Sequence, residues 1–452
     1  MSYNLRGVLR LESCNQYAHN LLAKIENKDL KIGVIGLGYV GLPLAVEKVK
    51  AGYHVTGFDI QLQRVEMINR GINYIGDVVD EELARIVREG RLTATTDYSR
   101  IREMDVITIC VPTPLDMHHQ PDTSYVENSA REIAKHFRKG TLVVLESTTY
   151  PGTTEELVKP ILEENGYRCG EDFFLAYSPE RVDPGNKIYK TKNTPKVIGG
   201  VTKTCTAIAA TLYRNVLEGD VHEVSSPAVA EMEKILENTF RIVNIALANE
   251  MAILCNRMGI DVWEVIDAAA TKPYGFMPFY PGPGVGGHCI PIDPFYLTWK
   301  AREFDYHTRL IELAGEINNS MPDFVVNRCM QILNREKKAL NGSRILVMGV
   351  AYKKDIDDYR ESPVIKILEQ LEEHEAEWTA VDPYVKQFKF KGRLISTYPS
   401  CSESDVRNAD LVLITTDHSA FDYEMLQKHA KIIFDTRNSI RSYKGPGKYY
   451  KL

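Results

Sequence analysis

Residues 31–41 read KIGVIGLGYVG, and this stretch decides the fold of the first half of the chain. The apolar run before Gly36 is typical of a buried strand, and the apolar spacing after Gly41 is typical of a helix. Gly36 permits a tight turn, Gly38 lets a ligand approach the backbone, and Gly41 lets the helix pack on the strand. The stretch therefore predicts the first strand–turn–helix of a parallel α/β sheet, with a helix N-terminus open to a phosphate.

A second predicted strand ends at Asp59, 18 residues after Gly41. A carboxylate at this point accepts hydrogen bonds from ribose hydroxyls and repels a 2′-phosphate. The glycine pattern and Asp59 together indicate a dinucleotide site that favours NAD over NADP. Arg64 lies close enough in sequence to leave NADP open.

The pattern of short apolar runs separated by helices continues beyond this motif, which indicates βαβ units. In the first half we predict strands at Lys31–Ile35, Tyr53–Phe58, Asp105–Val111, Thr141–Glu146, Phe173–Tyr177 and Lys196–Gly199. Between them lie predicted helices such as Val40–Lys50, Ser124–Phe137 and Thr154–Glu164. From Arg344 the alternation resumes, with strands predicted at Arg344–Val350, Glu377–Val381, Asp410–Thr415 and Lys431–Phe434.

Two helical regions frame the first sheet. Before Lys31, apolar residues at helical spacing predict an N-terminal helical extension over residues 1–28: Leu11, Ala18, Leu21, Leu22 and Ile25. After Ser226-Pro227 no helix breaker follows until Gly259, which predicts a helix of about 32 residues. Such a length suits a spine that joins two domains. Its apolar residues could form a dimer seam: Ile235, Ile242, Val243, Ile245, Ala246 and Ile253.

The fold class is therefore α/β, with two Rossmann-like doubly wound parallel-sheet domains joined by a long central helix. The 452 residues, with 44% hydrophobic and 26% charged, fit such globular domains and argue against a fibre or long disorder. The net charge of −6 favours no nucleic-acid partner. No apolar run approaches the roughly 18 residues of a membrane-spanning helix, and the charged N-terminus leads us to expect no signal peptide.

Eight cysteines are present, and no two form a CxxC pair, so we expect neither a metal site nor a redox pair. Cys289 differs from the others because it stands in GVGGHCIPIDP, residues 284–294. On a glycine-rich loop near an NAD site, its thiolate could add to an aldehyde and leave a thioester for hydrolysis. A buried structural thiol is the open alternative. For His288 we expect a packing role.

Such chemistry needs a base and a group that stabilises an oxyanion. Lys234 and Asn238 are four residues apart on the predicted long helix and share a face. Glu180 and Thr148 follow predicted strands, where open α/β sheets hold ligands. In the second sheet Lys353, Arg360 and Arg437 lie near strand ends, and a single glycine at position 349 suggests a mononucleotide rather than a dinucleotide. Structural roles remain open for each.

Ordered motifs along residues 30–440 resemble the UDP-sugar 6-dehydrogenase family, which includes the UDP-glucose, UDP-N-acetylhexosamine and GDP-mannose dehydrogenases. These motifs are GLGYVGLPLA, the VPTP turn at 111–114, ESTTYPGT, SPERVDPG, AEMEKILENT, GPGVGGHCIPIDP, GVAYKKDIDDYRESP and FDTRN. The resemblance implies a four-electron oxidation of a sugar C6 alcohol to a uronic acid with NAD, through a thioester on Cys289. It also implies a cytoplasmic homodimer that serves surface polysaccharide synthesis such as capsule or O-antigen.

The resemblance assigns roles residue by residue. The catalytic set is Cys289, Lys234, Asn238, Glu180, Thr148 and Asp293. The cofactor set is Gly36, Gly38, Tyr39, Val40, Gly41, Asp59, Arg64, Pro112, Thr113, Thr148 and Arg360. The UDP-sugar set is Glu180, Arg181, Lys234, Asn238, Tyr280, Gly286, Lys353 and Arg437. The implied domains are the N-terminal extension (1–28), an NAD-binding Rossmann domain (29–224), a central helical dimerisation domain with the cysteine loop (225–330) and a UDP-sugar-binding domain (331–452).

Two departures bear on the substrate. Pro184 stands where the UDP-glucose branch has a second glutamate, and KPYGF at 272–276 replaces a basic residue of that branch. The run from Lys272 to Leu297 resembles the UDP-N-acetylglucosamine branch most, with UDP-glucose and UDP-N-acetylmannosamine as alternatives. A two-electron hydroxyacid dehydrogenase and an inactive nucleotide-sugar sensor are further alternatives. The sensor would lack Cys289, Lys234 or Glu180, which are all present.

Overall fold

The computed structural model describes residues 15–452 except 117–119, 184, 187 and 288. The chain divides into two compact units, Met1–Leu236 and Glu237–Leu452. Each unit contains one large sheet with helices on both faces, which confirms the predicted fold class. All predicted strands form, within two residues at each end. Within the described part of the chain, no helix combines the length and the apolar character needed to cross a membrane.

The sheet of the first unit has the order β3-β2-β1-β4-β5-β6-β7-β8. Its strands are β1 (Lys31–Ile35), β2 (His54–Phe58), β3 (Leu92–Thr95), β4 (Val106–Ile109), β5 (Leu142–Leu145), β6 (Phe174–Tyr177), β7 (Lys196–Gly200) and β8 (Val221–Val224). The first six follow the Rossmann order. The pair β6–β7 is antiparallel, so the expectation of a wholly parallel sheet is wrong at this edge. No helix forms between these two strands in the described residues, and an antiparallel neighbour needs none.

Alternating residues of these strands enter two separate cores. In β5, Leu142 and Val144 pack on one face of the sheet, and Val143 and Leu145 pack on the other. The helices are α1 (Gln16–Glu26), α2 (Gly41–Lys50), α3 (Leu62–Asn69), α4 (Asp80–Arg88), α5 (Ser124–His136), α6 (Lys159–Glu163) and α7 (Lys203–Val216), with a 3-10 turn at Tyr98–Glu103 and a π-helical turn at Thr154–Val158. Helix α1 packs against α7 and buries Ala18, Leu21 and Ile25, whereas Leu11 lies outside the described residues.

Helix α8 (Pro227–Met258) has the predicted 32 residues. It ends before Gly259, whose φ of +72° suits a helix C-terminus. The proposed dimer seam needs correction, because Ile235, Ile242 and Ala246 are buried within the chain itself. A different apolar set is exposed along this helix, with spacings of three to seven residues: Val229, Met232, Leu236, Phe240, Leu247, Leu254 and Met258.

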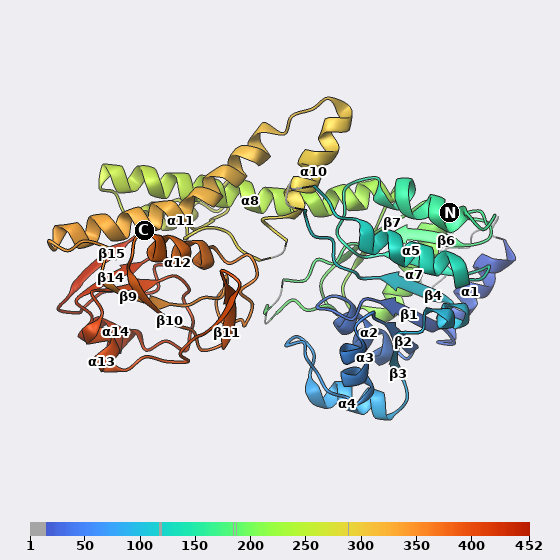
Figure 1. The fold of residues 1–452 in the computed structure, drawn as a ribbon. Coiled ribbons are helices and arrows are strands. Elements are labelled where there is room, and N and C mark those ends of the chain that lie inside the picture. The colour runs from blue at the N-terminus through green and yellow to red at the C-terminus, as the bar shows by residue number, and fades with distance from the viewer. Residues whose placement is uncertain (1–14, 117–119, 184, 187, 288) are drawn as a thin grey trace. The chain divides into compact units, whose positions relative to one another are not determined.

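The sheet of the second unit has the order β10-β9-β13-β14-β15, which is the other common doubly wound order. Its strands are β9 (Arg344–Met348), β10 (Glu377–Val381), β13 (Leu411–Ile414), β14 (Ile432–Asp435) and β15 (Lys448–Lys451), and β11 (Gln387–Phe390) forms a separate hairpin with β12 (Arg393–Ser396). The helices are α9 (Val262–Ala270), α10 (Asp293–Ala301), α11 (Arg309–Arg335), α12 (Pro363–Glu373), α13 (Glu403–Asn408) and α14 (Tyr423–His429), with a 3-10 turn at Arg302–Phe304. Figure 1 shows α11 and α12 on one face of this sheet and α13 and α14 on the other.

Candidate active site

In the glycine turn after β1, two glycines are required by the fold and a third leaves space for a ligand. Gly36 has a φ of +87°, and a Cβ there would lie 2.5 Å from the carbonyl oxygen of Cys110. A Cβ on Gly41 would lie 1.8 Å from the carbonyl oxygen of Gly36. By contrast, a Cβ on Gly38 would meet no protein atom within 4 Å. The turn itself requires Gly36 and Gly41, whereas Gly38 leaves its face open to a ligand beside the start of α2, as a pyrophosphate needs.

Asp59 is fixed beside this turn. Its carboxylate is 4% exposed and accepts the backbone N–H of Leu37 at 2.9 Å and of Gln61 at 2.9 Å. Arg64 lies 3.6 Å from the same carboxylate. The predicted ribose acceptor therefore has a defined position next to the glycine turn, and Arg64 is its ion-pair partner. The residues present fit a dinucleotide whose ribose hydroxyls meet a carboxylate.

The remaining predicted cofactor residues of the first unit line the same edge of the sheet. Tyr39 is exposed within the glycine turn, and Val40 directly precedes α2. Pro112 is exposed in the loop after β4. The hydroxyl of Thr113 donates to the carbonyl oxygen of Thr148 at 2.6 Å, so the loops after β4 and β5 are joined at the carboxyl ends of their strands.

The loop after β5 contains a residue that the sequence analysis passed over. The hydroxyl of Thr149 is buried and has no hydrogen-bond partner among the described residues. The loop is anchored by Glu231 of α8, which accepts the backbone N–H of Gly152 at 2.6 Å and both the N–H and hydroxyl of Thr154. Burial raises the pKa of the Glu231 carboxyl to about 7, although these hydrogen bonds oppose the rise. The loop is thus clamped one turn of α8 before Lys234.

Glu180 is held from both of its oxygens. Its Oε1 accepts the backbone N–H of Arg181 at 2.9 Å and of Val182 at 3.0 Å, and its Oε2 lies 3.3 Å from Nζ of Lys196. Burial acts to raise the pKa of this carboxyl, but Lys196, the two N–H groups and Lys234 outweigh it and lower the pKa. Glu180 is therefore a fixed and ionised carboxylate.

The two other cations near this carboxylate have fixed places as well. The guanidinium of Arg181 donates to the carbonyl oxygen of Pro195 at 3.0 Å and lies 3.4 Å from Glu233. The side chain of Lys234 is largely buried, with 7% of the residue exposed. The predicted Pro184 departure lies outside the described residues.

In the second unit the structure brings Cys289, Asn238 and Asp293 together. Cys289 is exposed, and its carbonyl oxygen accepts the N–H of Asp293 at 2.9 Å. Asp293, the first residue of α10, is 2% exposed and accepts the amide of Asn238 at 2.6 Å. Four other cysteines, at positions 110, 205, 255 and 329, are buried, while Cys14 and His288 lie outside the described residues. Among the described cysteines, only Cys289 is exposed.

The glycine-rich loop before Cys289 packs on the carboxyl edge of the second sheet. A Cβ on Gly286 would lie 2.5 Å from Cβ of Tyr352, so close packing already explains the glycine there. A Cβ on Gly282 would lie 2.5 Å from Nη1 of Arg437. The guanidinium of Arg437 also donates to the carbonyl oxygen of Thr415 at 2.9 Å, and burial lowers its pKa. Arg437 is thus fixed between the glycine-rich loop and the strand ends.

The other predicted residues of the second unit have partners of their own. Lys353 is half-buried in the loop after β9. Arg360 is exposed and pairs with Asp358 at 2.7 Å, while its backbone carbonyl accepts the N–H of Gly287. The hydroxyl of Tyr280 donates to Asp267 at 2.7 Å. The contacts of Arg360 with Asp358 and of Tyr280 with Asp267 set the positions of these two side chains.

The predicted site residues divide between the units. Thr148, Glu180 and Lys234 belong to the first unit, whereas Asn238, Cys289, Asp293, Lys353 and Arg437 belong to the second. Lys234 and Asn238 are four residues apart on the continuous helix α8, as predicted. Sequence reasoning missed Thr149, Glu231, Glu146 and Lys196. For Glu146 and Lys196 the one available signal was a charged residue directly beside a run of buried apolar strand residues.

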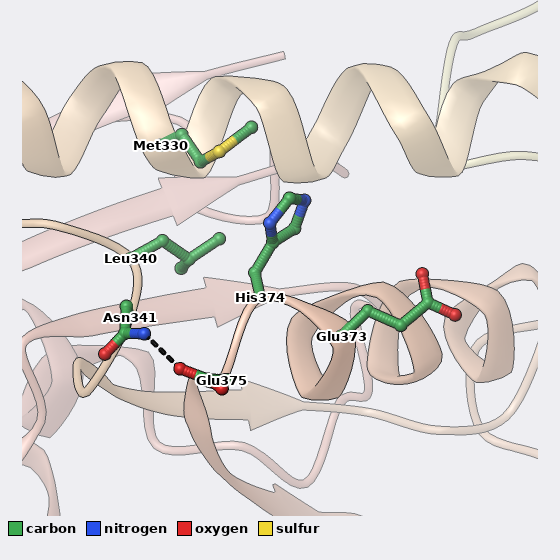
Figure 2. A pocket seen from close by; sticks show the side chains of 6 residues that line it. All are labelled: Met330, Leu340, Asn341, Glu373, His374 and Glu375. Atoms are coloured by element: carbon green, nitrogen blue, oxygen red, sulfur yellow. Dashed lines mark hydrogen bonds between the residues drawn. The ribbon is translucent and has the colours of Figure 1, made fainter.

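A surface hollow elsewhere in the second unit does not fit the predicted chemistry. Figure 2 shows its lining by Met330 of α11, by Leu340 and Asn341, and by residues 373–375 at the end of α12. These segments precede β9 and β10 and so lie at the amino ends of the strands. Ligands of open α/β sheets bind at the carboxyl ends, where Arg437 and the glycine-rich loop lie.

Three family models match the chain in order. They are the NAD binding domain of the UDP-glucose/GDP-mannose dehydrogenase family at residues 30–217, its central domain at 228–320 and its UDP binding domain at 346–442.

Similar proteins agree with these matches. The chain is 41% identical over 359 residues to a UDP-N-acetyl-D-glucosamine 6-dehydrogenase of Pseudomonas aeruginosa, covering 79% of this chain and 84% of that one. It is 38% identical over 418 residues to a UDP-N-acetyl-D-mannosamine dehydrogenase of Pyrococcus horikoshii, covering 91% and 96%. A solved structure of UDP-D-ManNAc dehydrogenase from Pyrococcus horikoshii superposes with a TM-score of 0.85 at 36% identity, covering 94% of this chain and 99% of that one. The chain therefore belongs to the UDP-glucose/GDP-mannose dehydrogenase family and is an NAD-dependent UDP-sugar dehydrogenase.

Proposed function

We propose that the protein oxidises the C6 alcohol of a UDP-N-acetylhexosamine, foremost UDP-N-acetylglucosamine, to the uronic acid. The observation that carries this proposal is the arrangement of the exposed Cys289 beside the buried pair Asn238–Asp293. The N-acetylglucosamine substrate rests on the 41% identity to a relative of that name and on the run from Lys272 to Leu297. Bound NAD accepts one hydride in each of two successive oxidations.

Cys289 supplies the covalent step. The first oxidation converts the alcohol to an aldehyde, and the thiolate of Cys289 adds to its carbonyl carbon to give a thiohemiacetal. Loss of the second hydride leaves a thioester, which water cleaves to release the carboxylate and restore the thiol. The balance is one alcohol, one water and two NAD⁺ to one carboxylic acid, two NADH and two protons. Because the carbonyl oxygen of Cys289 is bonded to the first turn of α10, the thiol has a fixed backbone behind it.

We assign the remaining catalytic roles to other charged and polar residues. We assign Lys234 and Asn238 to the oxyanion that forms when the thiolate adds, since an ammonium and an amide both donate hydrogen bonds to it. Asp293 holds the Asn238 amide in place through the 2.6 Å hydrogen bond. Glu180 is the base for the hydrolytic water, which Thr148 helps to position. An ionised Glu180 can accept the proton of this water.

For the nucleotide half we assign Arg437 and Lys353 to the diphosphate. Both follow strand ends of the second sheet, and each carries a positive charge to an anionic ligand. Gly286 contributes the backbone of the glycine-rich loop, since a side chain there would strike Tyr352.

NADH formation with a panel of UDP-sugars tests the proposal. We expect two NADH per UDP-N-acetylglucosamine and the fastest turnover with that sugar. Cys289→Ser should bind NAD normally and form no acid. One NADH per sugar, or full turnover in Cys289→Ser, would contradict covalent catalysis, and faster turnover of UDP-glucose would contradict the N-acetyl assignment.

UDP-N-acetylmannosamine is the second candidate substrate. The Pyrococcus relative of that name is similar over a larger share of the chain, 91% against 79%. The same panel separates the two sugars, because they differ only in the configuration at C2.

We also propose that the enzyme is a homodimer in the cytoplasm. The exposed apolar set along α8 supports the dimer, since an isolated monomer would leave side chains such as Phe240, Leu247 and Leu254 in water. A free thiol persists most readily where disulfides are rare, which supports the cytoplasm. Leu247→Glu should lower the sedimentation coefficient to that of a monomer. A product destined for surface polysaccharide follows from the proposed uronic acid.

A further inference from the structure

A buried group of ionisable side chains lies directly behind Glu180 in the first unit. Lys196 of β7 is 3.3 Å from Glu180 and 2.7 Å from Glu146, which follows β5. The other oxygen of Glu146 accepts the hydroxyl of Tyr213 and lies 3.9 Å from Nζ of Lys48. Lys196 therefore joins a carboxylate at the candidate site to a carboxylate inside the core.

The burial of this group makes its pairing obligatory. The side chains of Lys48 and Glu146 are 0% exposed and that of Lys196 is 5% exposed, while Glu180 retains 13%. Charges without partners at such depth would strongly destabilise the folded state, so the fold keeps them only as a connected set. The reaction proposed for Cys289, with Lys234 and Glu180, uses neither Lys196 nor Glu146.

We propose that Lys196 is a positioning residue that keeps Glu180 ionised and correctly oriented for the hydrolytic step, and that Glu146 anchors Lys196. This inference rests on the proposed role of Glu180 as the base. Two backbone N–H groups fix Oε1 of Glu180, and Lys196 is the one side-chain cation bonded to Oε2 among the described residues. Without it, Oε2 would have no cation within hydrogen-bonding distance among the described residues.

The positive charge of Lys196 opposes the effect of burial on the pKa of Glu180. Burial favours the protonated, neutral carboxyl, which cannot take a proton from water. Lys196 is the strongest of the groups that oppose this on Glu180, ahead of the backbone N–H groups and Lys234. Glu146 and Glu180 in turn raise the pKa of Lys196 despite its burial, so the ammonium stays charged throughout the neutral range. Cys110, Lys48 and Tyr213 are the other ionisable groups around Lys196 and Glu146. Burial raises the pKa of Cys110 and of Tyr213 and lowers that of Lys48 to about 8.

The test compares Lys196→Met with a matched control, Lys48→Met. Both lysines are buried and lie near Glu146, but Lys48 makes no hydrogen bond to Glu180 and bonds instead to Thr108 at 3.1 Å. In Lys196→Met the acidic limb of the pH–rate profile for acid formation should move up by about one to two pH units, as expected on removal of an adjacent opposite charge. Lys48→Met should leave the limb in place, and Lys196→Arg should restore it. A wild-type limb in a folded Lys196→Met would overturn the proposal.

Glu146→Gln serves as a second variant in case Lys196→Met does not fold. Glutamine keeps the size of the side chain but removes the charge that holds Lys196 at 2.7 Å, so Lys196 should be less well placed beside Glu180. The acidic limb should therefore move up, in the same direction as in Lys196→Met but by less. An unchanged or lower limb would contradict the anchoring role. A general loss of stability would lower the rate at every pH without moving the limb.

A direct titration separates this inference from the proposed function. With 13C-carboxyl-labelled glutamate, the Glu180 resonance is the one lost in Glu180→Gln, and its titration gives the pKa of Glu180 without catalysis. We expect this pKa to rise in Lys196→Met. If Glu180→Gln still forms acid, the base assignment fails, yet the titration still reports on Lys196; an unchanged Glu180 pKa in Lys196→Met would overturn the Lys196 inference alone.

Discussion

The turns after the first strands of the two sheets share a glycine with positive φ and a buried aspartate that accepts a backbone N–H. β1 is followed by Gly36 with a φ of +87°, and β9 by Gly349 with a φ of +97°. Each turn is held by a buried aspartate at the end of the neighbouring strand. Asp59 accepts the N–H of the residue after Gly36 at 2.9 Å, and Asp382 accepts the N–H of the residue after Gly349 at 2.7 Å.

The turns differ in the length of chain between the glycine and the next helix. Helix α2 begins at Gly41, five residues after Gly36, whereas α12 begins at Pro363, 14 residues after Gly349. A short turn offers the N–H groups of a helix start to a phosphate. The long loop instead offers side chains, among them Lys353. The same strand–glycine–aspartate unit therefore suits a dinucleotide when the helix begins at once, and leaves charge recognition to side chains when the helix begins later.

The largest expected effect comes from closing the short turn. In Gly41→Ala the Cβ would lie 1.8 Å from the carbonyl oxygen of Gly36, and α2 could not begin where it does. We expect the first unit to lose more than about 4 kcal/mol of stability, the range of severe backbone and packing defects. Urea unfolding followed by circular dichroism measures this loss. Gly76→Ala is the control, because its Cβ would meet no atom within 4 Å. Equal stability of the two variants would show that the short turn is not needed by the fold.

The next largest effect is expected from Gly38→Ala, which should weaken NAD binding without destabilising the fold. Gly38→Ala should fold with a melting temperature close to wild type, because its Cβ meets no protein atom within 4 Å. The methyl group would occupy the face offered to the pyrophosphate, so we expect NAD affinity to fall at least about a hundredfold, or about 2.7 kcal/mol. Isothermal titration calorimetry with NAD measures it, again against Gly76→Ala. Retained affinity would place the pyrophosphate elsewhere.

This turn and the helix α8 were predictable because each has a local physical cause. KIGVIGLGYVG combines strand, turn and helix requirements in 11 residues, and Ser226-Pro227 and Gly259 mark both ends of α8. The exposed Cys289 was predictable for the same reason, since glycines crowd around it. The pair Asn238–Asp293 was not predictable as a contact, because 55 residues separate its members.

The elements that escaped prediction depend on tertiary packing. The strands β3, β8 and β15 are short edge or near-edge strands with weak apolar patterns, and partners rather than propensity form them. The antiparallel pairing of β6 with β7 depends on how the loop between them, which contains no helix among the described residues, brings β7 back beside β6. Lys196 and Glu146 looked like ordinary charges beside strands, and only the fold brings them behind Glu180.

The carboxylates that hold these loops, Glu231 and Asp382, both accept backbone N–H groups but have opposite pKa shifts. Asp382 accepts N–H groups from its turn and also lies 3.2 Å from Nε2 of His418. Although burial acts to raise the pKa of Asp382, His418 and the N–H groups lower it. Among the described residues no cation pairs with Glu231, and Glu155 adds to the effect of burial that raises its pKa to about 7. The two carboxylates should therefore respond to pH in opposite directions.

The smallest expected effect is this difference in pH dependence. A raised pKa means that folded protein binds more protons than unfolded protein between the ordinary glutamate pKa of 4.5 and about 7, so the stability contributed by Glu231 is full below that window and is lost as pH rises through it. Glu231→Gln does not titrate. The stability of wild type relative to Glu231→Gln should therefore fall by about 1.8 kcal/mol from pH 5.5 to 7.5, at 1.36 kcal/mol per pKa unit. Urea unfolding across this range measures it. Asp410→Asn is the control, since Lys338 and the N–H of Arg344 lower the Asp410 pKa and confine its titration to acid pH, and its difference from wild type should stay constant. A constant difference for Glu231→Gln as well would mean that the three hydrogen bonds to Glu231 offset its burial, and that the loops of the two units are held in the same way.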